Sequence, residues 1–213
     1  MDNLTRVSPD IKGLYATAPQ SIPIGPSLVI RAFLLQREQG NLLIYSTNKI
    51  TQDALEDKGG AVRHYMNHGH EASFYPNKID TPTYIHQNDY ESVKNKIEVS
   101  ATFSETARLG DDFEIIPTPG HTPGSTCYLW DNGAHRILFT GDMLYLQYDR
   151  WFAPLLGSSN RGPYLKSLRR IRELDFDVLL PWVTIQDQPF YYFVSKKEVE
   201  KQVTKVIERM EDK

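Results

Sequence analysis

Cysteine is almost absent from this chain of 213 residues, which contains a single one, Cys127. One cysteine excludes an intramolecular disulfide, and scarcity of cysteine is typical of reducing compartments, so we expect a cytoplasmic protein. Cys127 lies in an apolar stretch with no base at a spacing that would activate it. This favours a small buried side chain over a nucleophile.

Long apolar runs and an excess of one charge are also missing. No stretch approaches the 18 apolar residues of a transmembrane helix, and residues 1–11 lack the apolar core of a signal peptide. The 24 Lys and Arg residues nearly balance the 27 Asp and Glu residues, for a formal net charge of −3. We therefore expect no membrane and no nucleic acid as partner.

What the chain does contain is a stiff loop around a histidine, TPGHTPGS at residues 118–125. Proline fixes φ on both sides of His121, while Gly120 and Gly124 allow tight bends. Each threonine that precedes a proline favours extended backbone. The segment therefore predicts a loop that holds one imidazole in a defined place, which suits a metal ligand.

Two other segments carry side chains that can bind a metal. Asp142 follows the apolar run 137–139, so we expect it just beyond the end of a buried strand. We expect His68 and His70 in an extended segment, where residues two apart point to the same side and can converge on one cation. Such a pair alone is a weak signal. His64 shares their alternation and is expected to be a half-exposed strand histidine, not a further ligand.

Taken together, the HGH segment, the TPGHTPGS loop and the TGD segment at 140–142 resemble the metallo-β-lactamase superfamily, over about residues 28–181. The resemblance implies an α/β (α+β) fold, a four-layer αββα sandwich. That sandwich needs about the length of this chain, so we expect one domain over residues 1–213, with an irregular lead-in at 1–27 and a C-terminal helix at 195–213. The resemblance also implies that a metal is bound by His68, His70 and His121, with Asp142 beside them.

The family's ligand pattern is incomplete here, and the losses fall on one side of the site. The family's H-x-H-x-D-H reads HGHEAS, so Ala72 and Ser73 stand where the family has aspartate and histidine. Val183, next to Trp182, stands where the family has its last histidine. In binuclear family members all three positions serve the second metal. We therefore predict a mononuclear site that keeps the bridging aspartate, Asp142.

One zinc ion held by three histidines keeps a position for water and lowers the pKa of that water to about 7. Asp142 would orient the water or accept its proton; if Asp142 binds the metal directly, open chemistry needs a fifth coordination position. Glu71 would face away from His68 and His70 in an extended segment, so we expect no base there. A zinc-bound hydroxide predicts hydrolysis, and the resemblance implies a small-molecule substrate, an ester, thioester or lactone.

Two other functions stay open. His68, His121 and Asp142 form a two-histidine, one-carboxylate set of the kind that non-haem iron oxygenases use. The set is similar to that of the mononuclear persulfide dioxygenases of the superfamily, which keep the Asp-His pair that is lost here. Alternatively the chain is a binding or structural relic of the fold and holds no metal. Metal analysis of the purified protein would separate the three functions. One zinc per chain indicates the hydrolase, iron with oxygen uptake indicates the oxygenase, and no metal indicates the relic.

Aromatic side chains cluster after Asp142, in a segment that borders the substrate pocket in the family. Their positions fit a pocket, the core or a homodimer contact equally well. The residues that we expect at the pocket are Tyr145, Tyr148, Trp151 and Trp182.

Overall fold

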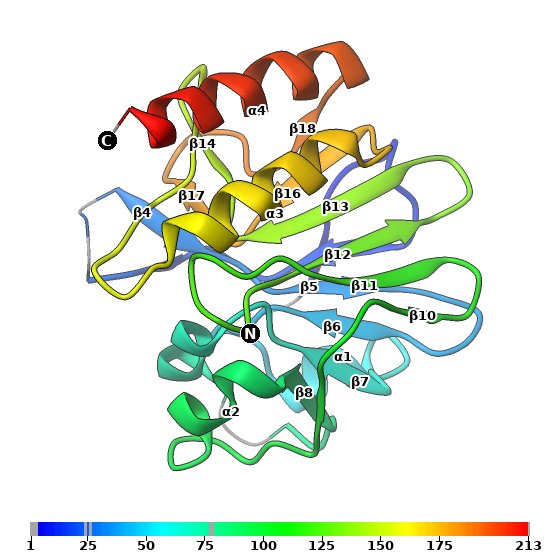
Figure 1. The fold of residues 1–213 in the computed structure, drawn as a ribbon. Coiled ribbons are helices and arrows are strands. Elements are labelled where there is room, and N and C mark those ends of the chain that lie inside the picture. The colour runs from blue at the N-terminus through cyan, green and yellow to red at the C-terminus, as the bar shows by residue number, and fades with distance from the viewer. Residues whose placement is uncertain (1–3, 24, 26, 77–78, 213) are drawn as a thin grey trace.

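The computed structural model describes residues 4–23, 25, 27–76 and 79–212, so parts of the expected lead-in and Lys213 of the expected C-terminal helix lie outside it. Two large β-sheets pack face to face, and helices cover the outer face of each sheet (Figure 1). This is the four-layer αββα sandwich, so the predicted fold class is confirmed. The outer layers are α3 (Arg161–Glu173) with α4 (Lys196–Glu211) on one side, and α1 (Gln52–Glu56) with α2 (Gln87–Val93) on the other.

The first sheet contains seven strands. In spatial order they are β1 (Thr5–Arg6), β2 (Leu14–Ala16), β5 (Phe33–Leu35), β6 (Leu42–Ile44), β7 (Arg63–Tyr65), β8 (Thr83–His86) and β9 (Ala101–Phe103). The central strands β5 and β6 read FLL and LLI and are buried throughout, because this sheet is covered on both faces. Strands β6 to β9 run parallel, so the chain leaves β6, β7 and β8 at the same edge.

The second sheet contains six strands. In spatial order they are β10 (Ala107–Leu109), β11 (Phe113–Pro117), β12 (Thr126–Asp131), β13 (Arg136–Gly141), β16 (Val178–Pro181) and β18 (Tyr192–Phe193). A turn joins β12 and β13, with the Asn132 Oδ1 atom accepting the N–H groups of Ala134 and His135. Helix α3 lies between the parallel strands β13 and β16 in the chain. The ends of β11, β13 and β16 and the start of β12 therefore share one edge.

Two smaller sheets flank the sandwich. One is a hairpin of β14 (Tyr145–Gln147) and β15 (Arg150–Phe152). The other has the order β17 (Val183–Ile185), β4 (Leu28–Ile30) and β3 (Gln20–Ser21). Because β17 follows β16 after Trp182 alone, this second small sheet lies at the same edge that the chain reaches after β13 and β16.

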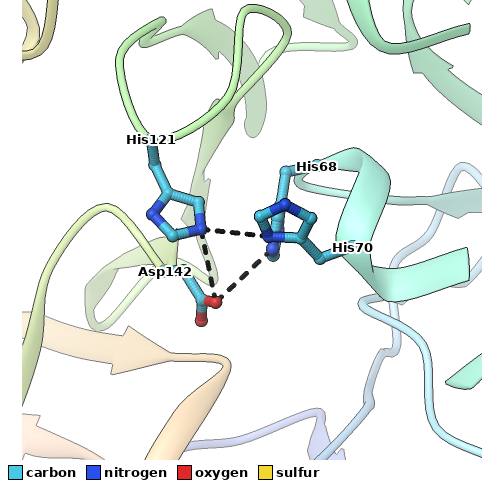
Figure 2. A group of neighbouring side chains, drawn as sticks. All are labelled: His68, His70, His121 and Asp142. Carbon is cyan, nitrogen blue, oxygen red and sulfur yellow. Dashed lines mark hydrogen bonds and ion pairs between the residues drawn. The ribbon is translucent and has the colours of Figure 1, made fainter. Parts of the chain in front are cut away.

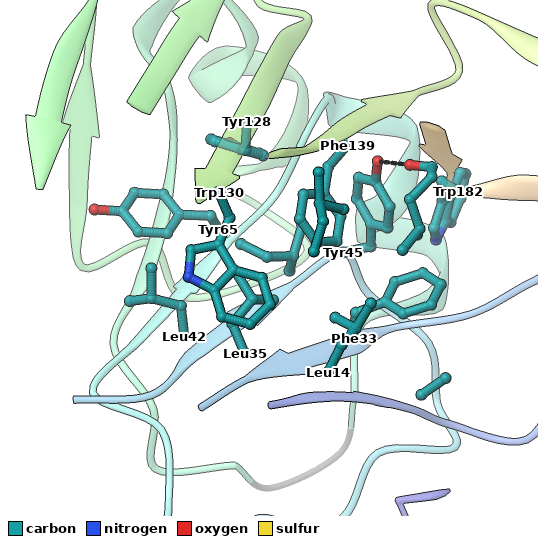
Figure 3. Packing of buried hydrophobic residues seen from close by; sticks show 14 of the residues in the cluster. Leu14, Phe33, Leu35, Leu42, Tyr45, Tyr65, Tyr128, Trp130, Phe139 and Trp182 are labelled. Atoms are coloured by element: carbon teal, nitrogen blue, oxygen red, sulfur yellow. Dashed lines mark hydrogen bonds between the residues drawn. The ribbon is translucent and has the colours of Figure 1, made fainter. Parts of the chain in front are cut away.

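Between the two large sheets lies a core rich in aromatic rings (Figure 3). The ring centroids of Phe33, Tyr45 and Phe139 are 6.0 Å apart in each pairing, in edge-to-face contacts. The Tyr45 hydroxyl donates to the Leu180 carbonyl at 2.9 Å and accepts the Gly141 N–H at 2.7 Å. Tyr45 thereby links the end of β6 to the ends of β13 and β16, while its own backbone has a left-handed φ of 66°.

One expected boundary is wrong. The lead-in at 1–27 is not irregular, because β1, β2 and β3 lie in it and β2 pairs with β5. The segment 27–35 is divided between two sheets, and the chain turns at Ala32, whose N–H donates to Thr17 Oγ1. The segment 101–109 is also divided between the two large sheets. The C-terminal helix is present from Lys196, and Ser195 caps its first turn.

Candidate metal centre

Four side chains named from the sequence meet at one edge of the sandwich. His68 follows β7, His121 lies in the loop between β11 and β12, and Asp142 follows β13. His70 lies in the short 3₁₀-helix η1 (Gly69–Phe74). Figure 2 shows all four pointing toward a common centre. One ligand atom from each lies within 4.8 Å of those of the other three, so the group could hold a metal ion.

The distances between these atoms fit a tetrahedral ion. Ligand atoms about 2.0–2.1 Å from zinc lie about 3.3–3.4 Å from one another. His121 Nε2 is 3.3 Å from His70 Nδ1 and 3.6 Å from Asp142 Oδ2. His68 Nε2 is 3.4 Å from Asp142 Oδ2. The donor set of three imidazoles and a carboxylate suits zinc, and it also suits iron.

The segment that carries His68 and His70 is not extended, contrary to expectation. From Gly69 the backbone coils into η1, and the cause is the side chain of Glu71. Its Oε1 atom accepts the N–H groups of Asn67 at 2.6 Å and His68 at 3.3 Å, and its Oε2 atom accepts the N–H of Ser46 at 2.7 Å. A carboxylate that collects backbone donors from both sides pulls the segment into a coil.

Glu71 therefore faces His68 and not away from it. Its Oε1 atom lies 3.6 Å from His68 Nδ1, and both side chains have no solvent exposure. Carboxylates in this position behind a metal-binding histidine orient the ring and leave its other nitrogen free for the metal. Glu71 is not placed to act as a base, because it lies behind the ring, but it supports the site in a way the sequence did not predict.

Hydrogen bonds and unpaired atoms indicate which atoms of the cluster are available to bind a metal. His121 Nδ1 lies 3.2 Å from the Pro154 carbonyl, which can only accept, so this nitrogen carries the proton and Nε2 presents a lone pair. Both ring nitrogens of His68 and the Oδ1 atom of Asp142 are buried and have no hydrogen-bond partner. Buried polar atoms without partners are costly, and a cation would satisfy those that face the centre.

Electrostatics in the cluster follow from burial and from its two carboxylates. Burial opposes a charge on His68, but Asp142 and Glu71 together outweigh it and raise the pKa of His68 to about 10. Burial and the charge on His68 lower the pKa of His121 to about 4, and the same two causes lower the pKa of His70. Burial opposes ionisation of Asp142, yet the histidines outweigh it and lower the pKa of Asp142. Asp142 is therefore ionised at neutral pH.

A second buried carboxylate, Asp89 at the start of α2, links the two histidine loops. It accepts the N–H of Gly69 at 2.8 Å and, from the other loop, the N–H of Gly124 at 2.7 Å and the hydroxyl of Thr122 at 2.6 Å. The two loops are thus fixed relative to one another. Sequence reasoning missed Asp89 because it lies in the polar stretch 87–96, which has no pattern that separates a buried carboxylate from surface ones.

The cluster lies at the wall of a cavity of about 780 Å³. His70, His121 and Asp142 all line it, and His70 is exposed while Asp142 is partly exposed. Of the aromatic residues expected at the pocket, Tyr145 and Trp182 line the same cavity. The volume lies in the range of pockets for small ligands, about 300–1,000 Å³.

The other two aromatic residues lie away from this cavity. Trp151 is 1% exposed and packs in the core between α4 and the second sheet, and Arg209 donates to its carbonyl. Tyr148 is 67% exposed at the tip of the β14–β15 hairpin, and its φ of 55° belongs to a tight turn. Side chains alternate between the two faces of a hairpin, so Tyr145, Tyr148 and Trp151 could not all line one pocket.

The three positions that lack family ligands differ in their surroundings. Ser73 and Val183 line the cavity, whereas Ala72 packs among Met66, Ile85 and Val93 in an apolar cluster under α2. The coil of η1 turns Ala72 away from the cavity. Restoring an aspartate at position 72 would therefore place a carboxylate in the core, not beside a metal.

We accordingly expect Ala72→Asp to lower the free energy of unfolding by about 2 kcal/mol or more, because a buried charge would have no partner. Urea denaturation measures this value. Ser73→Asp is the matched control, since Ser73 is the next residue and is exposed, and it should change stability little. Uptake of an additional zinc ion by Ala72→Asp would contradict the placement of Ala72 in the apolar cluster.

His64 is fully buried and not half-exposed as expected. Its Nε2 atom lies 3.0 Å from the Tyr45 carbonyl and so carries a proton, while Nδ1 lies 3.2 Å from Thr83 Oγ1. These contacts tie β7 to β6 and β8, which accounts for a polar residue in a central strand. His64 points away from the metal cluster and contributes to stability.

Because burial lowers the pKa of His64 to about 4, the unfolded chain binds a proton at this residue at a higher pH than the folded chain does. This contribution to stability is complete above about pH 6.5 and is lost as the pH falls toward 4, by about 3 kcal/mol. The unfolding free energy of the wild type and His64→Gln, measured from pH 7.5 to 4.5, should show a shallower decline for the variant. Parallel curves would mean that His64 does not titrate in this way.

Known proteins resemble this chain in sequence and in fold. The family model for the metallo-beta-lactamase superfamily matches residues 53–181. An uncharacterized protein of Aquifex aeolicus is 25% identical over 189 residues, covering 75% of this chain and 85% of its own.

A membrane span needs a long apolar helix, and none of the helices in the described part of the chain meets this requirement.

Solved structures show the same fold at low sequence identity. A metallo-beta-lactamase from Pontibacter korlensis superposes with a TM-score of 0.68 at 12% identity, covering 100% of both chains. The metallo-beta-lactamase GOB-18 from Elizabethkingia meningoseptica superposes with a TM-score of 0.63 at 14% identity, covering 99% of this chain and 92% of its own. At these identities the likeness supports the fold alone. The family model spans more than half of the sequence, and on that basis the chain belongs to the metallo-β-lactamase superfamily.

Proposed function

We propose that the protein is a hydrolase with one metal ion, acting on a small ester, thioester or lactone. The observation that carries the proposal is that the cluster is assembled yet open on one side. Structural zinc sites are closed, whereas catalytic sites keep access for water and substrate. Here three of the four candidate ligands line a cavity of ligand size.

The ion would be held by His68 Nε2, His70 Nδ1, His121 Nε2 and Asp142 Oδ2, and three of the separations among these atoms, 3.3, 3.4 and 3.6 Å, are close to those around a tetrahedral ion. Bound zinc supplies a water of lowered pKa and polarises a carbonyl group. With four protein ligands, the site needs a fifth position for catalysis, and the exposed side of His70 and Asp142 leaves room for one.

The residues around that position divide the remaining tasks. Asp142 is partly exposed and is ionised at neutral pH, so its carboxylate orients the attacking water or accepts its proton. Burial and the charge of Asp142 raise the pKa of Tyr145, so its hydroxyl stays protonated and donates to the substrate carbonyl oxygen. Attack on the carbonyl carbon then breaks its bond to the leaving oxygen or sulfur, which takes up the proton.

Two contacts support a single ion. The ring of Trp182 packs edge to face against His68 with centroids 5.3 Å apart, and against Phe74 at 5.7 Å. Trp182 is fixed there because its Nε1–H donates to the Ser46 carbonyl at 3.0 Å. Carbon atoms therefore occupy the space beside His68 where a neighbouring ion and its waters would need polar partners. Among the described residues, the four-residue cluster is the one such group of candidate ligands.

The test combines metal analysis with activity. Zinc and iron are measured in the purified protein, and hydrolysis of 4-nitrophenyl butanoate, a butanoyl thioester and γ-butyrolactone is followed before chelation, after it and after zinc is restored. The proposal expects about one zinc per chain and activity that is lost and recovered with the metal. Iron with oxygen uptake would favour an oxygenase, and hydrolysis that survives complete metal removal would refute the proposal.

A further inference from the structure

One side of the cavity is apolar. We define the apolar wall as the side chains of Ile22, Leu28, Phe74, Trp182 and Val183, all of which line the cavity. Ile22, Trp182 and Val183 belong to the core between the two large sheets, and Leu28 and Phe74 pack against that core. The one polar group of the wall, the Trp182 Nε1–H, is already paired with the Ser46 carbonyl. The wall is therefore held rigidly and offers a ligand no hydrogen bond from its side chains.

The apolar wall begins at the metal cluster and runs outward without interruption. Trp182 touches His68 at one end and Phe74 beside it. Val183 lies in β17, which pairs with β4, where Ile185 stands opposite Leu28. The Ile22 N–H donates to the Leu28 carbonyl at 3.2 Å, which brings β3 alongside. A chain attached to a group at the cluster can lie along these residues.

Apart from the metal cluster, several polar and charged side chains of the cavity come from α2 and the segment that follows it. Asn88, Glu91 and Ser92 belong to α2, and Lys96 follows it. Among the described residues that line the cavity, Lys96 is the one lysine or arginine. A charged part of a ligand would be attracted there, so the apolar wall is left for an uncharged, apolar part.

We propose that the apolar wall binds the hydrocarbon chain joined to the reacting carbonyl, so the substrate is a medium-chain acyl compound. The assignment to a substrate rests on the proposed function, whereas the affinity of the wall for a hydrocarbon chain does not. Burial of apolar surface in this cavity makes each added methylene strengthen binding about fourfold, until the wall is covered.

The experiment uses straight-chain alkyl hydroxamates, whose head group binds zinc. Affinities of the zinc-loaded protein for the acetyl, butanoyl, hexanoyl and octanoyl compounds are measured by calorimetry. The inference expects about a fourfold gain per methylene, and loss of that gain when the last methyl is replaced by a carboxylate. Dissociation constants that do not change with chain length would overturn it.

Variants locate the effect. Leu28→Asp places a charge in the apolar wall and should flatten the dependence on chain length while leaving the affinity for acetohydroxamate unchanged. Leu155→Asp is the matched control, because Leu155 is exposed and does not line the cavity. If Leu28→Asp fails to fold, Val183→Thr replaces one methyl by a hydroxyl and should weaken octanoyl binding several-fold. If Leu155→Asp weakens octanoyl hydroxamate binding as much as the variants in the apolar wall do, the assignment of the hydrocarbon chain to the wall is wrong.

A second series separates the two proposals. Primary alcohols of the same lengths are titrated into metal-free protein. One outcome is that zinc does not bind, that alcohols bind more tightly as their chains lengthen, and that Leu28→Asp removes this dependence on length. The proposed function then fails and the apolar wall is upheld. If zinc binds and esters are hydrolysed but neither series depends on length, the function is upheld and the inference fails.

Discussion

Replacing His121 by alanine should weaken zinc binding by about 100- to 1,000-fold. His121 Nε2 lies 3.3 Å from His70 Nδ1 and 3.6 Å from Asp142 Oδ2, and the hydrogen bond to Pro154 fixes its proton on the far nitrogen. Zinc held by four protein ligands binds with about 10–16 kcal/mol in total, so one ligand contributes about 3–4 kcal/mol. Competition with a chromophoric chelator measures the change.

His135→Ala is the control for this variant. His135 is also a histidine in a loop, but it pairs with Asp177 at the other end of β13, remote from the cluster. Its removal should leave zinc affinity unchanged. Equal affinity of His121→Ala and the wild type would show that the ligand assignment is wrong.

Glu71→Gln should weaken zinc binding about 10- to 100-fold and lower the free energy of unfolding by about 3–5 kcal/mol. The carboxylate accepts three backbone N–H groups, two on Oε1 and one on Oε2. An amide of the same shape has one oxygen, so its NH₂ group must face at least one N–H donor. The coil of η1 then loosens, and His68 loses the anion behind its ring.

Two measurements separate the effects of Glu71→Gln. Denaturation of the metal-free protein reports the lost hydrogen bonds, and chelator competition on the folded protein reports the orientation of His68. Glu105→Gln is the control, because Glu105 is exposed and should change neither value. A variant with reduced stability but unchanged zinc affinity would limit Glu71 to a structural role.

Much of the fold could be predicted from the sequence because its signals are local and strong. The stiff loop at 118–125 and the buried strand that precedes Asp142 depend on residues close together in the chain, and the structure has both where expected. That His121 and Asp142 meet was implied by the resemblance to the metallo-β-lactamase superfamily, and both belong to the cluster. The expected C-terminal helix is present, with Ser195 as its cap.

The predictions that failed concern contacts between distant segments. Nothing in the local pattern shows that Glu71 reaches the N–H of Ser46, and this contact turns an expected extended segment into a 3₁₀-helix. Asp89 and His64 looked like surface residues, because burial of a polar side chain depends on partners that other strands and loops provide. Short strands such as β3 carry too few residues for a period to show.

These corrections change the surroundings of the site and leave its four candidate ligands unchanged. The lost ligand at position 72 is not a vacant place beside the metal, since Ala72 is part of an apolar cluster. Around Trp182 and Val183 the cavity wall is likewise apolar. The apolar surroundings of Ala72 and Val183 therefore support the proposal of one ion and of an uncharged ligand part at this wall.

The most direct test of this account is anomalous diffraction from crystals of the zinc-loaded protein, recorded on both sides of the zinc absorption edge. The account predicts one peak per chain, bounded by His68 Nε2, His70 Nδ1, His121 Nε2 and Asp142 Oδ2, with Trp182 still packed against His68. Two peaks side by side, or no peak among these four residues at saturating zinc, would contradict it.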